Sequence, residues 1–303
     1  MIVDRALTAA LARLSAIPGL AVSERQLHHE VCRTLRPLAG PRVPGAWGLL
    51  AAGLLGGLTT GALAAGATAV ALGLARRLPY TRSPPIDDAT FTAALARHTA
   101  RHGRPAILAQ RTGLHPGLTN REPDLWDYGM ARALVLDDDD LAAALVATGV
   151  HLELGCAVFG LADISPLPAP VLAMLARTPG ARVFHLHDAS HAALAGVPRL
   201  RARLGLPLAV GLSSIGLRPA HARAMHLFTR TGAPPARDAV AALIGLAPRE
   251  RAWLLAGHTC EVAAVPPLRL LRALRRLVLA VPRKSPPTRA QRRAGGFLTW
   301  PPP

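Results

Sequence analysis

The chain has 303 residues, enough for one or two domains, and 50% of them are apolar while 17% are charged, which excludes general disorder. The 35 Lys and Arg against 18 Asp and Glu give a net charge of +17, an excess that indicates affinity for phosphate or an anionic surface. The three cysteines lie far apart and form no CxxC pair, which argues against a disulfide framework and a Cys-rich zinc site.

Residues 1–42 form the first predicted unit, which is helical. Apolar residues at helical spacing predict a helix over 2–16, and Ser23 is a good N-cap for a second helix over 24–36. Two short helices joined by a Pro-Gly turn are compatible with the front of a winged helix or helix-turn-helix. The pattern alone favours a plain helical hairpin.

The segment 43–77 contains a long stretch without charge. From Val43 to Ala75 no side chain is ionisable over 33 positions, and Trp47 and the pair Arg76-Arg77 stand at its edges. A hydrocarbon core needs about 20 apolar residues, and Trp and Arg are common interfacial anchors. We therefore expect a membrane segment here, and favour it over a buried helix of a soluble core.

The number of membrane crossings is open at this point. As one helix, Trp47 to Leu74 spans about 42 Å, which is long for a single pass, whereas two full passes need about 40 residues. A re-entrant hairpin bent at 56–61, where the sequence reads GLTTG after Gly56, is the alternative. The arginines on the two sides are balanced, so the positive-inside rule does not decide the orientation. Residues 78–127 are expected to be a linker with helical parts.

Residues 128–230 carry the clearest pattern of the chain. Short apolar runs alternate with helical segments of about ten residues, which predicts an α/β fold with a Rossmann-like parallel sheet core and flanking helices. The expected strands cover residues 132–136, 156–161, 181–188 and 208–217.

Acidic side chains follow two of these strands. In a parallel sheet, ligands bind at the carboxyl ends of the strands, where Asp137 and Asp138 follow the first strand and Asp188 follows the third. Converging carboxylates could bind Mg²⁺, so Asp138 and Asp188 are candidate catalytic residues and all three are candidate metal ligands. The alternative for Asp138 and Asp188 is helix capping, which is the favoured interpretation for Asp139 and Asp140.

Histidines surround Asp188 in the sequence HLHDASH. His185 and His187 are two apart on one strand and His191 follows, yet the spacing matches no zinc signature, so a histidine-ligated metal is not favoured.

Several of these motifs resemble one family. The sequences VLDDDD, LHDAS and SIGLRP are similar to elements of the Toprim domain, as found in the A subunit of topoisomerase VI and its meiotic double-strand-break relatives. The sequence SERQLHHE resembles the winged-helix segment that carries the nucleophilic tyrosine in that family. The resemblance implies a Toprim-like domain over 128–230, with the metal-binding acids supplied by Asp137 or Asp138 and by Asp188.

The same motifs also depart from the family. His28 and His29 stand where the family has its tyrosine pair, so the phenolic nucleophile is absent from these positions. The second acid of the family's Asp-x-Asp motif is Ser190, and loss of a carboxylate weakens Mg²⁺ binding. The family mechanism of DNA cleavage is therefore not expected.

The C-terminal part combines helices with a basic tail. Residues 231–282 read as helices, the last of them amphipathic, with Arg269, Arg272, Arg275 and Arg276 over a broad sector. Such a helix can bind anionic lipid or nucleic acid, and the scarcity of aromatics favours lipid over RNA. Residues 283–303 are Pro/Gly/Arg-rich and expected to be disordered.

These observations combine into an expected function. The leading hypothesis is a membrane-associated, non-catalytic Toprim-like binding or regulatory protein, in a bacterial inner membrane with its soluble part in the cytoplasm. The first alternative is a Mg²⁺-dependent phosphoryl-transfer enzyme using Asp138 and Asp188, and the second is a membrane tether for DNA. The chain contains no P-loop, GxGxxG, GxSxG or HExxH motif.

Overall fold

A computed structural model of the chain describes residues 2–36, 82–110, 131–162, 166–243 and 245–280. The predicted membrane segment 43–77 and the predicted disordered tail 283–303 lie outside these ranges. Within the ranges, no helix is both long enough and apolar enough to cross a membrane.

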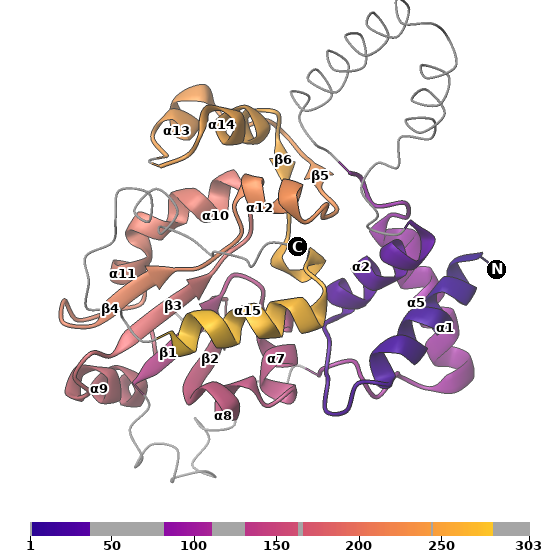
Figure 1. Cartoon of the computed structure of the whole chain (residues 1–303), viewed down its shortest axis with the longest axis horizontal. Coiled ribbons are helices and arrows are strands. Elements are labelled where there is room, and N and C mark those ends of the chain that lie inside the picture. The colour runs from indigo at the N-terminus through magenta and orange to yellow at the C-terminus, as the bar shows by residue number, and fades with distance from the viewer. Residues whose placement is uncertain (1, 37–81, 111–130, 163–165, 244, 281–303) are drawn as a thin grey trace, which may run out of the picture.

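A four-stranded parallel sheet lies at the centre of the fold, as the alternation of strands and helices predicted (Figure 1). Its strand order is β2-β1-β3-β4, and the pairing sets Leu134 opposite both Val158 and Phe184. The four strands are β1 (Arg132–Leu136), β2 (Cys156–Gly160), β3 (Arg182–Leu186) and β4 (Gly211–Ser214).

The two faces of the sheet pack into two different hydrophobic cores. Successive side chains of a strand point to opposite faces, so Leu134 and Leu136 enter one core while Ala133 and Val135 enter the other. Because both faces are covered, the central strands are apolar at nearly every position, which is why they could be recognised in the sequence.

Helices cover both of these faces. The smaller core is closed by α9 (Ala169–Arg177) and α11 (Leu200–Arg203), through residues such as Val171 and Leu200. The larger core is closed mainly by α7 (Asp139–Ala147), α8 (Val150–Leu154), α14 (Pro248–Leu255) and α15 (Pro267–Leu279). Three short helices complete this part of the chain: α10 (His191–Gly196), α12 (Pro219–Ala224) and α13 (Arg237–Ala241).

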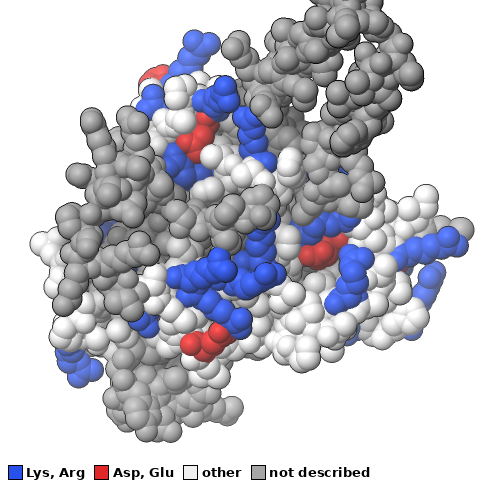
Figure 2. Space-filling view, in the orientation of Figure 1, with Lys and Arg blue, Asp and Glu red and all other residues white. Residues whose placement is uncertain are grey.

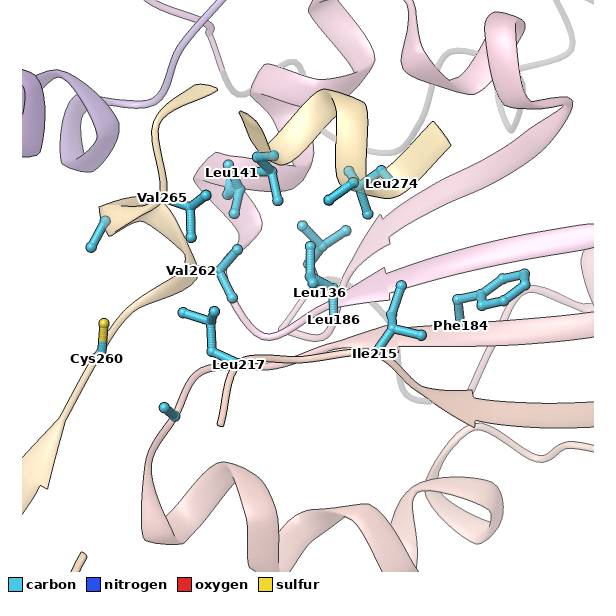
Figure 3. Close-up of a cluster of buried hydrophobic side chains, with 14 of the residues drawn as sticks. Leu136, Leu141, Phe184, Leu186, Ile215, Leu217, Cys260, Val262, Val265 and Leu274 are labelled. Atoms are coloured by element: carbon cyan, nitrogen blue, oxygen red, sulfur yellow. The ribbon is translucent and has the colours of Figure 1, made fainter. Parts of the chain in front are cut away.

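The C-terminal helix α15 shares its core with the sheet. Figure 3 shows Leu274 of α15 above Leu136 and Leu186 of the neighbouring strands β1 and β3. Val262 and Val265, from the segment that leads into α15, belong to the same cluster. Residues 231–280 therefore contribute directly to the core that covers one face of the sheet.

The N-terminal helices form a separate hydrophobic core. It is built by α1 (Ile2–Ser15), α2 (Glu24–Leu35) and α5 (Asp88–His102), with Leu7 and Leu27 fully buried in it. A parallel β-bridge between Val22 and Leu108 adds a backbone connection. We call this part, residues 2–36 and 82–110, the N-terminal unit.

The part of the predicted helical region 231–282 that precedes residue 260, together with the residues just before it, is not helical throughout. Besides α12, α13 and α14 it contains a small antiparallel pair, β5 (Arg230–Thr231) with β6 (His258–Thr259). Strands of two residues leave no hydrophobic run or alternation in the sequence, so the expectation of helices alone was wrong at these positions.

Candidate functional site

Polar side chains gather where β1 and β3 end. The strand order changes direction between these two strands, since the chain continues from β1 to β2 on one side and from β3 to β4 on the other. In open α/β sheets a crevice forms at such a point, outside the carboxyl ends of the strands. We call the side chains gathered there the strand-end cluster: Asp137, Asp138, His185, His187, Asp188 and, from a distant part of the sequence, Glu261.

Two of the acids are joined to neighbouring groups. Asp137 follows β1 and its Oδ1 lies 2.8 Å from Nε2 of His185, on the adjacent strand β3. Asp138 is the N-cap of α7, where its Oδ1 accepts a hydrogen bond of 3.0 Å from the backbone N–H of Leu141. Burial raises the pKa of Asp138 because it disfavours the charged form. Capping, one of the two alternatives from the sequence, therefore describes the contact that Asp138 makes.

His187 is held inside the protein next to the acids. Its Nε2 lies 2.8 Å from Oγ of Ser214 on β4, and its Nδ1 lies 2.9 Å from the carbonyl oxygen of Asp188. Burial lowers the pKa of His187 to about 4, so the ring is neutral at pH 7. A Cβ at Gly216 would collide with His187, so the chain after β4 needs glycine there.

Asp188 binds a backbone group from the C-terminal part of the chain. Its Oδ1 accepts a 2.7 Å hydrogen bond from the N–H of Val262, and a β-bridge joins the flanking residues Ala189 and Cys260. Burial raises the pKa of Asp188 to about 7, an effect to which the nearby carboxylates add. Asp188 therefore connects the end of β3 to the segment that leads into α15.

Glu261 links this segment to α2 of the N-terminal unit. Its carboxylate accepts a 2.5 Å hydrogen bond from Nη1 of Arg25 and lies 3.3 Å from Nε2 of His29. A third contact is to Arg230, whose Nε lies 3.6 Å away. Although burial alone would raise the pKa of Glu261, the hydrogen bond from His29 and the two arginine charges lower it overall, so the side chain is ionised.

The two histidines at the family's tyrosine positions are buried. His29 is almost fully inaccessible, and burial lowers its pKa, so a neutral ring donates from Nε2 to Glu261. His28 contacts Phe91 with ring centroids 4.8 Å apart, and its Nε2 lies 3.2 Å from the carbonyl oxygen of Ile86. His29 therefore links the N-terminal unit to Glu261, whereas His28 packs within the unit.

The arrangement does not fit the predicted Mg²⁺ site. A hard cation needs several charged oxygens that converge on one point. Among the side chains that the structure describes, no three from His, Cys, Asp and Glu are placed to hold a metal ion. Asp137, Asp138 and Asp188 are close in the fold, but each already makes the contact given above. The metal role of these acids stays a prediction, and no reaction step is derived through it.

Two pockets lie at the seam between the N-terminal unit and the rest of the fold. One, of about 590 Å³, is lined by His28, Asp88 and Arg230 together with neighbouring residues. The other, of about 450 Å³, lies between Glu24 of α2 and Asp140 of α7. Neither is lined by the candidate metal ligands, so these two openings do not lead to the predicted site.

The predicted basic residues lie on α15. Arg272, Arg275 and Arg276 are exposed and Arg269 is partly buried. Figure 2 shows the cations gathered over this helix, beside an acidic side chain. Arg275 forms an ion pair with Glu153 of α8, with Nη2 2.8 Å from Oε2. The structure therefore places these four arginines together, as their helical spacing predicted.

Glu261 is the residue of the strand-end cluster that sequence reasoning missed. Its signal is a single acid inside the apolar run HTCEVAAV, since an ionisable residue in a buried segment normally has a specific partner. The partner side chains Arg25 and His29 are more than 230 residues away in the sequence, so the contact itself could not be inferred.

Comparison with protein-family models, with curated proteins and with solved structures finds no match for this chain. The structure defines the class of protein: an α/β protein with a four-stranded parallel sheet of order β2-β1-β3-β4 and flanking helices.

Proposed function

We propose that this chain is a membrane-associated, non-catalytic α/β protein with a degenerate Toprim-like domain, which binds or regulates a partner on the cytoplasmic side of the membrane. The observation that carries the proposal is that the strand-end acids and the two histidines at the tyrosine positions make contacts inside the protein. In a catalytic site of this class the same positions have to be open to metal and substrate.

The Toprim-like assignment rests on where the acids lie. Asp137 and Asp138 follow the central strand β1, and Asp188 follows its neighbour β3, so both acidic positions are at one edge of the sheet. The helix that carries His28 and His29 packs against the same part of the fold through Glu261. This arrangement supports the resemblance stated from the motifs.

The non-catalytic character rests on chemistry. Phosphoryl transfer by the family mechanism needs a nucleophile and ionised metal ligands. Histidine supplies no phenolic hydroxyl, and Asp188, with a pKa of about 7, is only partly ionised at neutral pH. The Oδ1 of Asp188 instead accepts a hydrogen bond from the N–H of Val262.

The proposal of membrane association rests on the uncharged stretch within 43–77. The fold of the flanking residues restricts how this stretch can cross a membrane. Segments on both sides of this stretch belong to the N-terminal unit, and Nη2 of Arg82 donates to the carbonyl oxygen of Arg36 with a distance of 2.7 Å. Arg36 and Arg82, the described residues that flank the stretch, are therefore on the same side of any membrane. We propose a re-entrant or tight hairpin rather than a single crossing.

Reporter fusions test the membrane part of the proposal. A reporter that is active only in the cytoplasm is fused to residue 1 in one chain and to residue 303 in another, and membranes are washed with alkaline carbonate. We expect both reporters to be active and the chain to stay in the membrane fraction. Reporters on opposite sides, or complete release by carbonate, would contradict the proposal.

Calorimetry tests the non-catalytic part. The full chain is titrated with Mn²⁺ alone, next to an Asp188→Asn variant, and both are incubated with plasmid DNA and Mg²⁺. We expect no saturable heat and no cleavage from either protein. A saturable heat that Asp188→Asn abolishes, together with cleavage by the unmodified chain, would favour the Mg²⁺-dependent phosphoryl-transfer enzyme instead.

A further inference from the structure

Helix α15 has apolar side chains on its exposed face as well as on its buried face. The buried face contains Leu270, Leu274 and Val278, which enter the larger core. At 100° per residue, Leu268 and Leu279 lie near the middle of the opposite face, and they are 41% and 45% exposed. A helix that only covers a core normally has polar residues at these positions.

Arginines flank these two leucines on both sides. Around the helix, Arg275 lies on one side of the leucines and Arg272 and Arg276 lie on the other, and all three are exposed. The helix contains no acid, so its own charge is uniformly positive. Leu268 and Leu279 are 11 positions apart, about 16 Å along the axis, so the leucine-centred, arginine-flanked face extends over most of the helix.

The neighbouring helix α8 extends the surface. Leu152 of α8 is 62% exposed, and the adjacent Glu153 pairs with Arg275 of α15. This ion pair neutralises Arg275. Arg272 and Arg276 are exposed, and neither is in an ion pair with a carboxylate among the described residues. Helix α8 contacts α15, so Leu152 is an exposed leucine on a helix that adjoins the arginines of α15, and Figure 2 shows cations gathered over α15.

We infer that the exposed face of α15, with Leu152 of α8, is a docking surface for an anionic lipid bilayer. The leucines enter the boundary between headgroups and acyl chains, and the long arginine side chains extend to the lipid phosphates. The inference rests on the membrane association proposed above. It adds a second membrane contact, besides the uncharged stretch, that is made by leucine and arginine side chains.

Charge complementarity and apolar exposure together select lipid as the partner. Nucleic acid would use the arginines, but it would leave Leu268 and Leu279 in water, because duplex DNA presents phosphates and not an apolar layer. A bilayer with anionic headgroups contacts both kinds of side chain at once. Residues 281–303, which follow α15 in the sequence, contain five more cations and no acid, so the C-terminal part of the sequence is positively charged.

A local fluorescent label tests the surface. All three cysteines of the chain are buried, so a Leu279→Cys variant can be labelled at one place with a polarity-sensitive dye. A Leu208→Cys variant is the matched control: Leu208 is 91% exposed and lies between α11 and β4, beside the core on the other face of the sheet. Each labelled full chain is mixed with two kinds of vesicle. Neutral vesicles contain phosphatidylcholine alone, and anionic vesicles contain roughly one phosphatidylglycerol in three lipids.

We expect the dye at position 279 to shift to the blue with anionic vesicles and not with neutral ones, and the dye at position 208 to show neither shift. In the 279 variant, Arg272→Gln and Arg276→Gln should each lower the partition coefficient by about fivefold, since one basic residue at an anionic surface contributes about 1 kcal/mol. High salt should reverse the shift.

The outcomes separate this inference from the membrane proposal on which it rests. Binding to neutral vesicles without a shift at position 279 would keep the membrane association and overturn the role of α15. Equal shifts at both labelled positions, or a shift that the arginine substitutions leave unchanged, would also overturn it. A shift with duplex DNA and none with vesicles would assign the surface to nucleic acid instead.

Discussion

At the ends of β1 and β3, ionisable side chains are buried or half-buried and contact one another or the backbone, whereas on α15 arginines lie at the surface beside exposed leucines. The strand-end cluster joins three distant parts of the chain through Glu261 and Asp188. On the exposed face of α15, Arg275 forms an ion pair with Glu153 of α8, and both partners are about half exposed. Ionisable residues thus have a structural role in one region and are available to a partner in the other.

The difference between these regions shows that a net charge of +17 does not identify the surface that binds an anionic partner. Both regions contain arginines, but Arg25 and Arg230 contact Glu261, while Arg272 and Arg276 are exposed. The total charge predicts attraction to an anionic partner, and only the placement of the cations identifies the surface that meets it.

Replacement of Glu261 should have the largest effect on stability. Glu261→Ala removes the acceptor for the buried Nε2 of His29 and the counter-ion of two arginines, so we expect the free energy of unfolding to fall by about 3 kcal/mol. Urea unfolding followed by circular dichroism measures the change.

Glu153→Ala is the matched control, since it also removes one glutamate from an ion pair. Both partners of the Glu153 pair are about half exposed, and such pairs contribute less than about 1 kcal/mol. Equal losses for the two variants would remove the distinction between the interior cluster and the surface of α15.

Asp188→Asn should make the protein more stable at alkaline pH. The pKa of Asp188 is about 7 in the folded protein and lies near 3.8 in the unfolded chain, so folding favours the protonated form. That stabilisation is complete below about pH 4 and is lost as the pH rises through 7. Asparagine cannot ionise and can still accept the hydrogen bond of Val262, so we expect a gain of about 2 kcal/mol at pH 8 and little change at pH 4.

The measurement is the difference in unfolding free energy between variant and unmodified chain at the two pH values. Asp140→Asn, at an exposed position in the first turn of α7, is the control and should change stability by less than about 1 kcal/mol. A gain for Asp188→Asn that is the same at pH 4 and pH 8 would mean that ionisation of this carboxyl is not involved.

The smallest effect is expected from Arg272→Gln combined with Arg276→Gln. Both side chains are exposed, so the free energy of unfolding should stay within about 0.5 kcal/mol of the unmodified chain. The same urea unfolding experiment measures it. A loss above about 1 kcal/mol would show that these arginines support the fold, and weaker vesicle binding by the double variant could then not be assigned to the surface.

The four strands could be predicted from the sequence because the sheet is covered on both faces. Runs such as RALVL and CAVFG are apolar throughout and are separated by helical segments, a pattern typical of buried parallel strands. The pair β5 and β6 could not be predicted, since its strands are two residues long and its paired residues are 27 and 29 positions apart. The strand order also depends on long-range contacts that leave no local pattern.

The candidate site was predicted only in part. The position of an acid directly after a buried strand predicted that Asp137, Asp138 and Asp188 lie at one edge of the sheet, because the carboxyl ends of neighbouring parallel strands meet there. Their role as metal ligands stays a prediction. What the sequence could not show is that Val262 and His185 engage two of them. In the sequence, an Asp that caps a helix cannot be distinguished from an Asp that binds a metal ion, because the contacts of the side chain are not known.

The bridge between Val22 and Leu108 has a consequence for synthesis of the chain. The N-terminal unit can close only after Leu108 has left the ribosome, whereas the uncharged stretch ends at Ala75. At 5–20 residues per second, the apolar stretch is therefore complete for roughly 2 to 7 s before its two flanks can pair. If the stretch enters a membrane as proposed above, the order of synthesis allows it to do so before the N-terminal unit folds.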